Sequence, residues 1–362
     1  MVRNIQSLRF VFIMLVVMSH IIGKSFDFGG ECGVAFFFML SGFILSYAYG
    51  EKVLAGEFRQ WVFLRRQLAK FYPLHVALFL LMILLDARLG RFYDWEKLVA
   101  NLLLLQSWVP SDDFYFVGNG LSWFLSDLLF FYAVFPMAFR LLTGQPPRRL
   151  LPAAAVVAML YAWLAATVPD SLVNPLLYAA PWTRMLDFSI GILLFRALRS
   201  DGGRAFRIWL SRRPALHVTL AELAMALLAV ASYFVYEAAS PRFRCASLFW
   251  LCLPAVLCLF VASDRLAGGV TRLLHTSPMQ WLGGISMEIY LTHWAFMRVL
   301  YSLLSPLGVG EQERLSPAVL ALTLGLIIVV AWLTKRYFVD PVYAAIAPGP
   351  APAQAAGKAD NH

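Results

Sequence analysis

The sequence predicts an all-α membrane protein, a polytopic helical bundle with about ten transmembrane helices. Of its 362 residues, 60% are hydrophobic and 14% are charged, and the mean hydropathy is +0.70. A soluble domain contains about 45–50% apolar and about 25% charged residues. Apolar runs of about 20 residues, the helical length that crosses the bilayer core, recur along the chain. Because no water-soluble fold can bury so much apolar surface, we expect lipid to be the solvent.

The predicted spans follow the apolar runs in order. They are Ile5 to Gly23, Val34 to Tyr49, Tyr72 to Leu89, Leu121 to Leu142, Leu151 to Val168, Thr183 to Leu198, His217 to Tyr236, Cys245 to Ala262, Ile285 to Leu304 and Pro317 to Phe338. The stretch from Leu98 to Val109 is short for a span and is expected to form an interfacial or re-entrant helix. Residues 1–343 would form one membrane domain, and residues 344–362, rich in Ala, Pro and Gly, a disordered tail.

The first apolar run is interpreted as a retained helix. Arg3 precedes it, as in a signal peptide, but no small-residue cleavage site follows it. Most of the 30 Lys and Arg residues then lie in every second loop, counted from the N-terminus. The positive-inside rule therefore places these loops and both termini in the cytoplasm. A net charge of +9 would suggest nucleic acid in a soluble protein, but here its distribution indicates membrane orientation.

The cysteines give no sign of a metal site or a disulfide framework. Their spacing is not that of metal ligands, and four in 362 residues is too sparse for a disulfide scaffold. We expect no bound metal, and we interpret the cysteines as apolar membrane residues. They are Cys32, Cys245, Cys252 and Cys258.

One face of the first span carries two ionisable residues. Arg9 and His20 are eleven positions apart, and at about 100° per residue their directions differ by about 20° and their heights by about 16 Å. Ionisable groups within a span usually face an interior cavity. This placement would make Arg9 an anion site at the cytoplasmic boundary and His20 a titratable group further along the same path. Alternatively, Arg9 snorkels to the interface and His20 lies at the outer one.

A basic cluster precedes the third span. Arg65, Arg66 and Lys70 lie at the cytoplasmic face in the predicted topology. They could bind an anionic ligand, or they could be a topology signal in contact with anionic lipid headgroups.

These segments, in this order, resemble the acyltransferase 3 family of multi-pass membrane acyltransferases. The resemblance rests on Arg9 and His20 and on six further segments that extend over nearly the whole chain. The segments are GVAFFFMLSGF from Gly33, FLRRQLAKFYPLH from Phe63, LSWFLSDLLFFYAVFP from Leu121, TRMLDFSIGILL from Thr183, LGGISMEIYLTHW from Leu282 and RYFVDP from Arg336.

The resemblance implies a multi-pass O-acyltransferase of the cell inner (cytoplasmic) membrane. Such an enzyme moves an acyl group, commonly acetyl, from acyl-CoA to a hydroxyl of a cell-surface or lipid-linked carbohydrate. The resemblance implies catalytic roles for Arg9 and His20, and binding of the donor's anionic nucleotide end by Arg65, Arg66 and Lys70. Lys70 stands here for a family arginine, which keeps the charge but loses the bidentate fork. Acyl-CoA would be a substrate, and no permanently bound cofactor is expected.

The matching segments hold further candidate site residues. These are Ser41, Trp123, Asp127, Arg184, Asp187, Glu288 and His293. A membrane-level carboxylate could orient His20 or the acceptor, and four qualify: Asp127, Asp187, Glu222 and Glu288. His293 could be catalytic or simply a packed, hydrogen-bonded histidine. The chain departs from the family pattern at Leu128 and Leu129, where a Trp-to-Glu pattern is common, and at Asp340, where Glu is common.

Two other classes of function are compatible with the pattern. A transporter or flippase for a glycan or lipid-linked precursor would also line a pathway with polar residues, although the sequence shows neither repeats nor paired broken helices. A membrane acyltransferase of another family would centre on a late histidine, for which His293 would qualify. The sequence leaves open the acceptor sugar, the acyl chain, direct or two-step transfer, the side on which the acceptor binds, and the oligomeric state.

Overall fold

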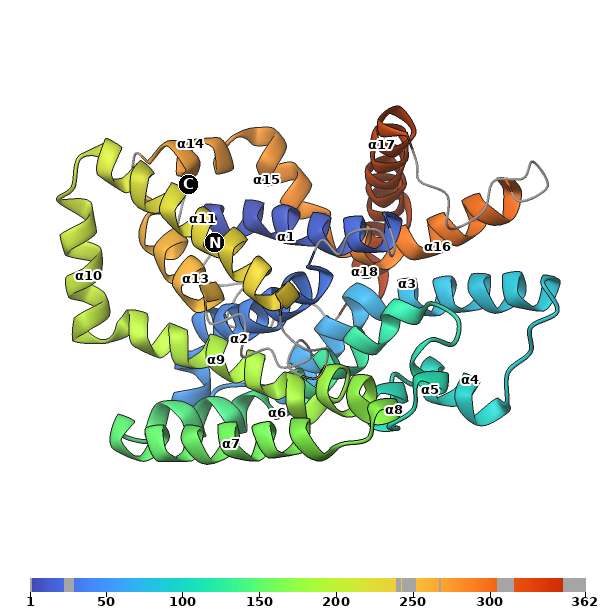
Figure 1. Ribbon diagram of the computed structural model, residues 1–362, viewed down its shortest axis with the longest axis horizontal. Helices are drawn as coiled ribbons and strands as arrows, with labels where there is room; N and C mark the ends of the chain where they lie inside the picture. Colours follow the sequence, from blue (N-terminus) through green and yellow to red (C-terminus); the bar gives the residue numbers. More distant parts are fainter. Residues whose placement is uncertain are drawn as a thin grey trace.

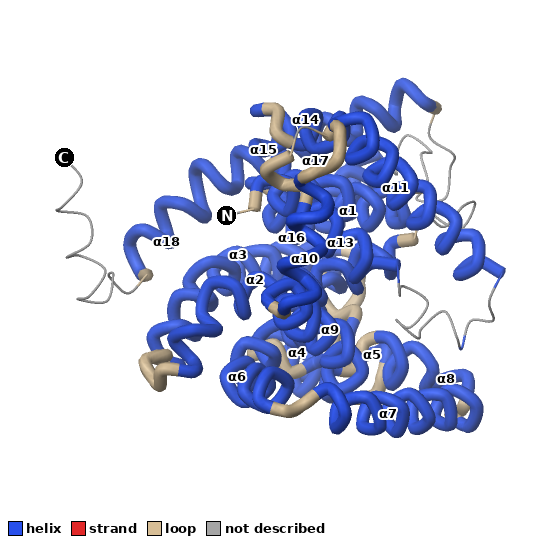
Figure 2. The backbone as a smooth tube through the Cα atoms, turned by 90° about the vertical axis from the view of Figure 1, so that its left-hand side faces the viewer, coloured by secondary structure: helices blue, strands red, loops and turns tan. Residues whose placement is uncertain are grey.

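The structure, a computed structural model, describes residues 2–22, 29–238, 242, 252–266, 268–304 and 316–347. Within these residues all regular structure is helical (Figures 1 and 2). The α-helices are α1 Arg3–Ile21, α2 Gly30–Leu54, α3 Gln60–Arg88, α4 Trp95–Leu102, α5 Asp112–Tyr115, α6 Trp123–Gly144, α7 Pro147–Thr167, α8 Asp170–Val173, α9 Pro181–Arg199, α10 Asp201–Ser211, α11 Ala215–Ala238, α13 Cys252–Ala262, α14 Gly269–Leu274, α15 Ser277–Gly284, α16 Ser286–Leu304, α17 Pro317–Thr334 and α18 Asp340–Ile346. Short 3₁₀ or π segments are η2 Gln106–Trp108, η3 Gly120–Ser122, η4 Asn174–Tyr178 and η7 Lys335–Val339.

The prediction of an all-α protein with membrane-spanning helices is confirmed. Seven described helical segments are long and apolar enough to cross a membrane: Arg3–Ile21, Gly30–Leu54, Gln60–Arg88, Gly120–Gly144, Pro147–Thr167, Ala215–Val235 and Pro317–Ile346. The runs predicted from Thr183 and Ile285 are the 19-residue helices α9 and α16. Both carry charged side chains that lower their hydropathy, such as Arg184 in α9 and Glu288 in α16. A count of ten spans therefore remains a prediction.

Three predicted boundaries fall at the edge of the described residues or differ from them. The start of the run predicted from Cys245 lies outside the described residues, and α13 is described from Cys252. Most of the predicted tail also lies outside them, while α18 continues to Ile346. The stretch from Leu98 to Val109 contains the end of α4 and the 3₁₀ turn η2.

The centre of the bundle is α2, which contacts α1, α6 and α9 (Figure 1). Its closest neighbour is α9, and the contact depends on two glycines. A Cβ at Gly42 would lie 2.1 Å from the carbonyl oxygen of Phe188, and a Cβ at Gly191 would lie 1.9 Å from that of Met39. Because lipid gives no hydrophobic force between helices, close backbone approach and dispersion contacts must hold them together.

Three packed phenylalanine rings extend this contact to α6. The Phe38 ring lies 5.1 Å from that of Phe131, which in turn lies 5.0 Å from Phe188, between ring centroids. All three side chains are fully buried. They join α2, α6 and α9 into one rigid wall.

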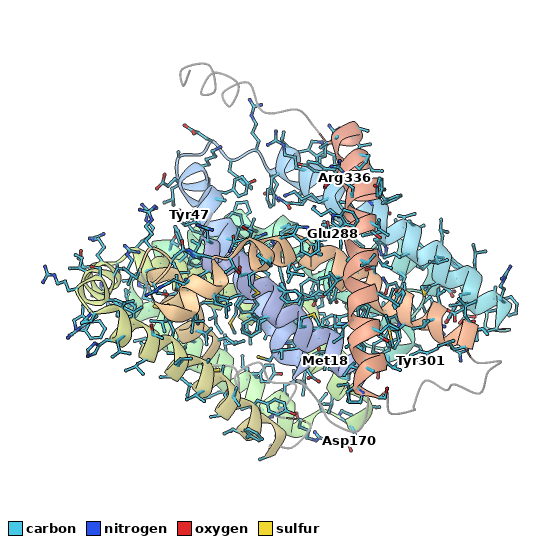
Figure 3. All side chains as sticks on the ribbon, turned by 90° about the horizontal axis from the view of Figure 1, so that it is seen from above. Met18, Tyr47, Asp170, Glu288, Tyr301 and Arg336 are labelled. Carbon is cyan, nitrogen blue, oxygen red and sulfur yellow. The ribbon has the colours of Figure 1, made fainter. Side chains whose placement is uncertain are left out.

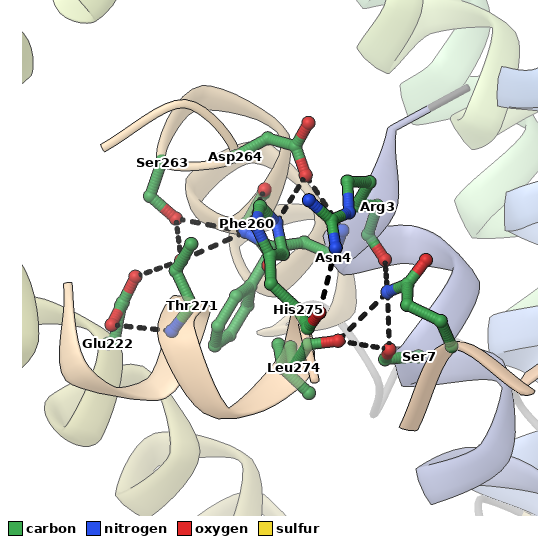
Figure 4. Close-up of polar contacts among 11 residues, drawn as sticks. Arg3, Asn4, Ser7, Glu222, Phe260, Ser263, Asp264, Thr271, Leu274 and His275 are labelled. Carbon is green, nitrogen blue, oxygen red and sulfur yellow. Dashed lines mark hydrogen bonds and ion pairs between the residues drawn. The ribbon is translucent and has the colours of Figure 1, made fainter. Parts of the chain in front are cut away.

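A buried polar network fixes the start of α1 against α13 and α14 (Figure 4). The side-chain amide of Asn4 donates to the Phe260 carbonyl at 2.9 Å and to Thr271 Oγ1 at 3.0 Å. The Ser7 hydroxyl donates to the Leu274 carbonyl at 2.5 Å. Since buried polar groups are costly unless they are hydrogen-bonded, these bonds define the position of α1 along its axis, and with it the heights of Arg9 and His20.

Glu222 belongs to the same network. Its Oε2 accepts from the backbone N–H groups of Val270 at 3.0 Å and Thr271 at 3.2 Å, at the beginning of α14. This carboxylate therefore satisfies the N–H groups at a helix start. Its bonds are made to α14, and no bond of the described residues links it to His20.

Candidate active site

The centre of the site is a pair of histidines from distant parts of the chain. His20 Nδ1 lies 3.1 Å from His293 Nε2, and His293 Nδ1 lies 3.0 Å from the Ile289 carbonyl oxygen. A carbonyl can only accept, so a neutral His293 carries its proton on Nδ1 and presents the lone pair of Nε2. His20 must then donate from Nδ1. Its own lone pair consequently lies on Nε2, which is the nitrogen a general base would use.

His20 faces a cavity of about 680 Å³. His293 is fully buried behind it, whereas His20 is exposed. Aromatic side chains form much of the wall: Phe116, Trp123, Tyr178, Tyr290 and Trp294. Polar groups complete the lining, among them Glu31, Arg91, Tyr93, Asn174 and Arg298. Apolar surfaces with a few convergent polar groups are typical of a small-molecule site.

One wall of the cavity is held by a buried carboxylate. The Asp86 side chain is fully buried in α3, and it accepts from both terminal nitrogens of Arg298, at 2.5 and 3.3 Å. Tyr93 Oη donates to Asp86 Oδ2 at 2.9 Å. Burial raises the pKa of Tyr93, and its bond to Asp86 raises it further. Tyr93 therefore stays protonated at neutral pH, and because its one proton is bonded to Asp86, its oxygen can only accept a hydrogen bond from a ligand.

A second buried ion pair supports the aromatic wall. Arg184 Nη1 donates to Asp187 Oδ2 at 3.0 Å, and both side chains are buried. The Arg184 guanidinium lies 4.3 Å from the centroid of the Tyr178 ring and donates through Nε to the Tyr178 carbonyl. Tyr178 packs against Trp123, with 5.2 Å between ring centroids. Of these predicted candidates, Trp123 lines the cavity. Arg184 and Asp187 do not line it but support it, because Arg184 contacts Tyr178, which does.

Asp127 lies one turn after Trp123 in α6 and is fully buried. Ser107 and Arg184 are polar groups near its carboxylate. It is absent from the described lining of the cavity. Ser41 is also absent from that lining, and its hydroxyl donates to the Phe37 carbonyl within α2 at 2.8 Å.

Cations from three helices gather at the other end of α1. Arg9 lies within electrostatic range of Glu288 and Tyr132, and Lys70 lies within range of Arg9, Arg66 and Lys335. Lys335 Nζ lies 3.3 Å from Glu288 Oε1. We call Arg9, Arg66, Lys70 and Lys335 the cation cluster.

The cation cluster contains two of the three predicted donor-binding residues. Arg66 is half-buried, whereas Arg65 and Lys70, on the same helix, are exposed. Successive helical residues point about 100° apart, and of the two arginines Arg66 is the one within electrostatic range of Lys70. The structure thus separates Arg65 from its neighbour.

Arg9 and His20 meet the same partner helix. Arg9 interacts with Glu288 and His20 bonds to His293, and both partners belong to α16. Figure 3 shows Glu288 and Arg336 towards one end of the bundle, and Met18 and Tyr301 towards the other. The two side chains therefore lie along one seam between α1 and α16, with the cation cluster at one end and the aromatic cavity at the other.

Comparison with known proteins agrees with this architecture. Residues 2–336 match the family described as an acyltransferase domain. The chain belongs to the acyltransferase 3 family. It is 32% identical to Acyltransferase MdmB of Streptomyces mycarofaciens over 321 residues, which is 83% of this chain and 78% of that protein.

Two further relatives of this acyltransferase 3 chain match it over less of their own length. It is 26% identical to the Putative peptidoglycan O-acetyltransferase YrhL of Bacillus subtilis (strain 168), over 78% of this chain and 46% of that protein. It is 45% identical over 49 residues to Protein 2 in picA locus of Rhizobium radiobacter, or 14% of this chain and 26% of that protein. No solved structure matches.

Several residues of the site carried no clear signal in the sequence. Arg91 and Tyr93 lie in a short connection between α3 and α4, and Tyr178 lies in a π-helical turn. Trp294, whose ring lies 5.5 Å from that of His20, could have been found because it follows His293 in the family-like segment. Lys335 could likewise have been found, since it precedes the segment that begins at Arg336.

Proposed function

We propose that this acyltransferase 3 protein moves an acyl group, commonly acetyl, from acyl-CoA to a hydroxyl of a cell-surface or lipid-linked carbohydrate, with His20 as the reacting group. The observation that carries the proposal is the bonding of the two histidines. It directs the Nδ1 proton of His20 towards His293, and so assigns the lone pair to Nε2 on a residue that lines a cavity of about 680 Å³.

The chemistry follows from that lone pair. His20 Nε2 accepts the acceptor's hydroxyl proton while the oxygen attacks the thioester carbonyl. Collapse of the tetrahedral intermediate breaks the carbon–sulfur bond, and the thiol leaves with a proton returned by His20. In a two-step route, Nε2 itself takes the acyl group first and passes it to the hydroxyl. The hydrogen bond from His20 Nδ1–H to His293 Nε2 serves both routes, because it orients the His20 ring and keeps the proton on Nδ1 throughout.

The cation cluster is the proposed site for the anionic end of the donor. Arg9, Arg66, Lys70 and Lys335 outnumber the carboxylates Glu288 and Asp340 that pair with Lys335. Charge-assisted bonds from Arg and Lys to phosphate are among the strongest hydrogen bonds in proteins. The predicted topology has ten spans in the inner membrane and both termini in the cytoplasm. In this topology the cation cluster lies at the cytoplasmic end of the bundle, on the same side as acyl-CoA.

The aromatic cavity is the proposed acceptor site. Its rings offer flat apolar surfaces, and Arg91, Tyr93 and Asn174 offer hydrogen bonds, which together suit a carbohydrate. A relative described as a putative peptidoglycan O-acetyltransferase supports a carbohydrate acceptor.

The test is acyl transfer by the purified protein in lipid vesicles. Vesicles carrying wild type or His20→Ala receive acetyl-labelled CoA and glycans extracted from the host, and labelled glycan is counted. We expect transfer by wild type and a loss of about 10²–10⁴-fold in the variant, the usual contribution of a general base. Equal transfer by both proteins would remove His20 from the reaction, and glycan flux without any acyl transfer would indicate a transporter.

A further inference from the structure

The helix α10 differs from its neighbours in direction and in composition. It joins α9 to α11 and runs crosswise to both (Figure 1). Leu210 packs with Val218 and Leu259 on its inner side, whereas Ile208 and Trp209 are half exposed. The helix also carries two arginines, Arg204 and Arg207. A short helix that combines a buried apolar side, exposed aromatic surface and basic residues is typical of one that lies in the membrane interface.

A groove lies beside α10, between that helix and α2, α9 and α13. Its volume is about 340 Å³. Three guanidinium groups line it, from Arg199, Arg204 and Arg207, and an apolar side is formed by Phe43, Tyr47 and Val261. No carboxylate is among its lining residues in the described part of the chain.

The arginines of the groove keep hydrogen-bonding capacity for a ligand. Arg199 pairs with Glu51 at 2.9 Å and Arg204 pairs with Asp201, but the carboxylate side chains are 80% and 95% exposed. Ion pairs that are this exposed contribute little and exchange readily with water. Each guanidinium also has five N–H donors, so one carboxylate leaves most of them for another anion.

We propose that this groove binds an anionic glycerophospholipid, with its phosphate on Arg204 and Arg207 and the start of an acyl chain along Phe43 and Tyr47. The combination of charge and apolar surface carries the assignment: Tyr47 is 62% exposed on a membrane helix, beside cations on an interfacial helix. A soluble phosphate would have no use for the apolar side. The groove shares no residue with the cation cluster or with the cavity at His20, so the inference is independent of the proposed reaction.

The experiment measures lipid retention by the whole protein. Detergent-purified protein is incubated with phosphatidylglycerol or phosphatidylcholine, and bound lipid is counted by native mass spectrometry. We expect wild type to retain phosphatidylglycerol over phosphatidylcholine, and Arg204→Gln/Arg207→Gln to bind it about tenfold more weakly, since a bond to a charged group contributes about that factor. The matched control is Arg148→Gln/Arg149→Gln, which removes the same charge from exposed arginines of α7 and should retain the lipid as wild type does.

Three results would overturn the proposal. Equal losses in both double variants would indicate diffuse attraction of charge, and equal retention of the two lipids by wild type would indicate no headgroup site. Displacement of phosphatidylglycerol by inorganic phosphate would indicate a site for a small anion. If the glutamine variant does not fold, Arg204→Lys/Arg207→Lys carries the test: it keeps the charge but loses the planar fork, so we expect partial loss, and full retention would contradict the assignment.

Discussion

Replacing His293 tests how the reacting histidine is held. In His293→Phe the ring persists, but His20 Nδ1 loses the acceptor that lies 3.1 Å away. The lost bond is worth about 0.5–1.5 kcal/mol, which corresponds to about 2- to 12-fold in the population of the Nδ1–H form. Looser orientation of the ring adds to this loss, and we therefore expect kcat to fall about 10- to 100-fold, which is less than for His20→Ala.

His293→Gln is the matched control for that variant. Its side chain can place an amide oxygen near the position of His293 Nε2, so it can still accept from His20 Nδ1. We expect kcat within about fivefold of wild type, with KM for the donor unchanged in both variants, because the cation cluster is untouched. The assay is acyl transfer from labelled acetyl-CoA, titrated up to saturation so that it gives both kcat and KM for the donor. A phenylalanine variant as active as wild type would refute the orienting bond, and one as inactive as His20→Ala, together with an inactive glutamine variant, would make His293 a proton carrier.

Three further predictions concern packing, the donor end and the cavity wall. Gly42→Ala should lower the apparent melting temperature in detergent, because its Cβ would meet a carbonyl oxygen at 2.1 Å and overpacking costs about 1–3 kcal/mol. The control Gly325→Ala, whose Cβ would meet no neighbouring atom within 4 Å, should leave the melting temperature unchanged. Equal melting temperatures of the two variants would contradict the close contact. Arg66→Gln should raise KM for acyl-CoA about tenfold. Substitution of the exposed Arg65 by Gln should raise it by less than about threefold. If donor titrations show the larger increase for Arg65→Gln, the assignment of the cation cluster as the donor site is refuted. Asp86→Asn should destabilise the protein by about 3–5 kcal/mol through loss of the buried partner of an arginine, and unchanged thermal unfolding would argue against that ion pair.

The helices were largely predictable because bilayer thickness dictates a long apolar run. The ends of the helices were harder to predict. For example, α3 begins at Gln60, twelve residues before the predicted span. A helix can extend beyond the lipid into a polar stretch of sequence, where hydropathy no longer indicates that the chain is helical. Pro73 lies inside the same helix, although proline usually ends one. In α9 the buried charges of Arg184 and Asp187 lower the hydropathy, so hydropathy alone does not identify this helix as a membrane span.

The site could be predicted only as far as one helix determines it. The common face of Arg9 and His20 follows from helical geometry, and both residues do meet α16. Their partners could not be derived, since His20 and His293 are separated by 273 positions and no local pattern encodes such a contact. Local sequence rules also could not show that Arg66 rather than Arg65 lies near Lys70. Nor could they show that the Glu222 carboxylate accepts from the backbone N–H groups at the start of α14. These assignments depend on which helix face packs inward, and that is decided by the whole bundle.

The most direct test of the account is the surface glycan of cells that carry the chain. Mass spectrometry compares glycans from cells with wild type, with His20→Ala at equal membrane abundance, and without the protein. We predict one acyl group per modified sugar in the first and its absence from the other two. An acylated glycan in cells that carry His20→Ala would contradict the central claim that this imidazole performs the transfer.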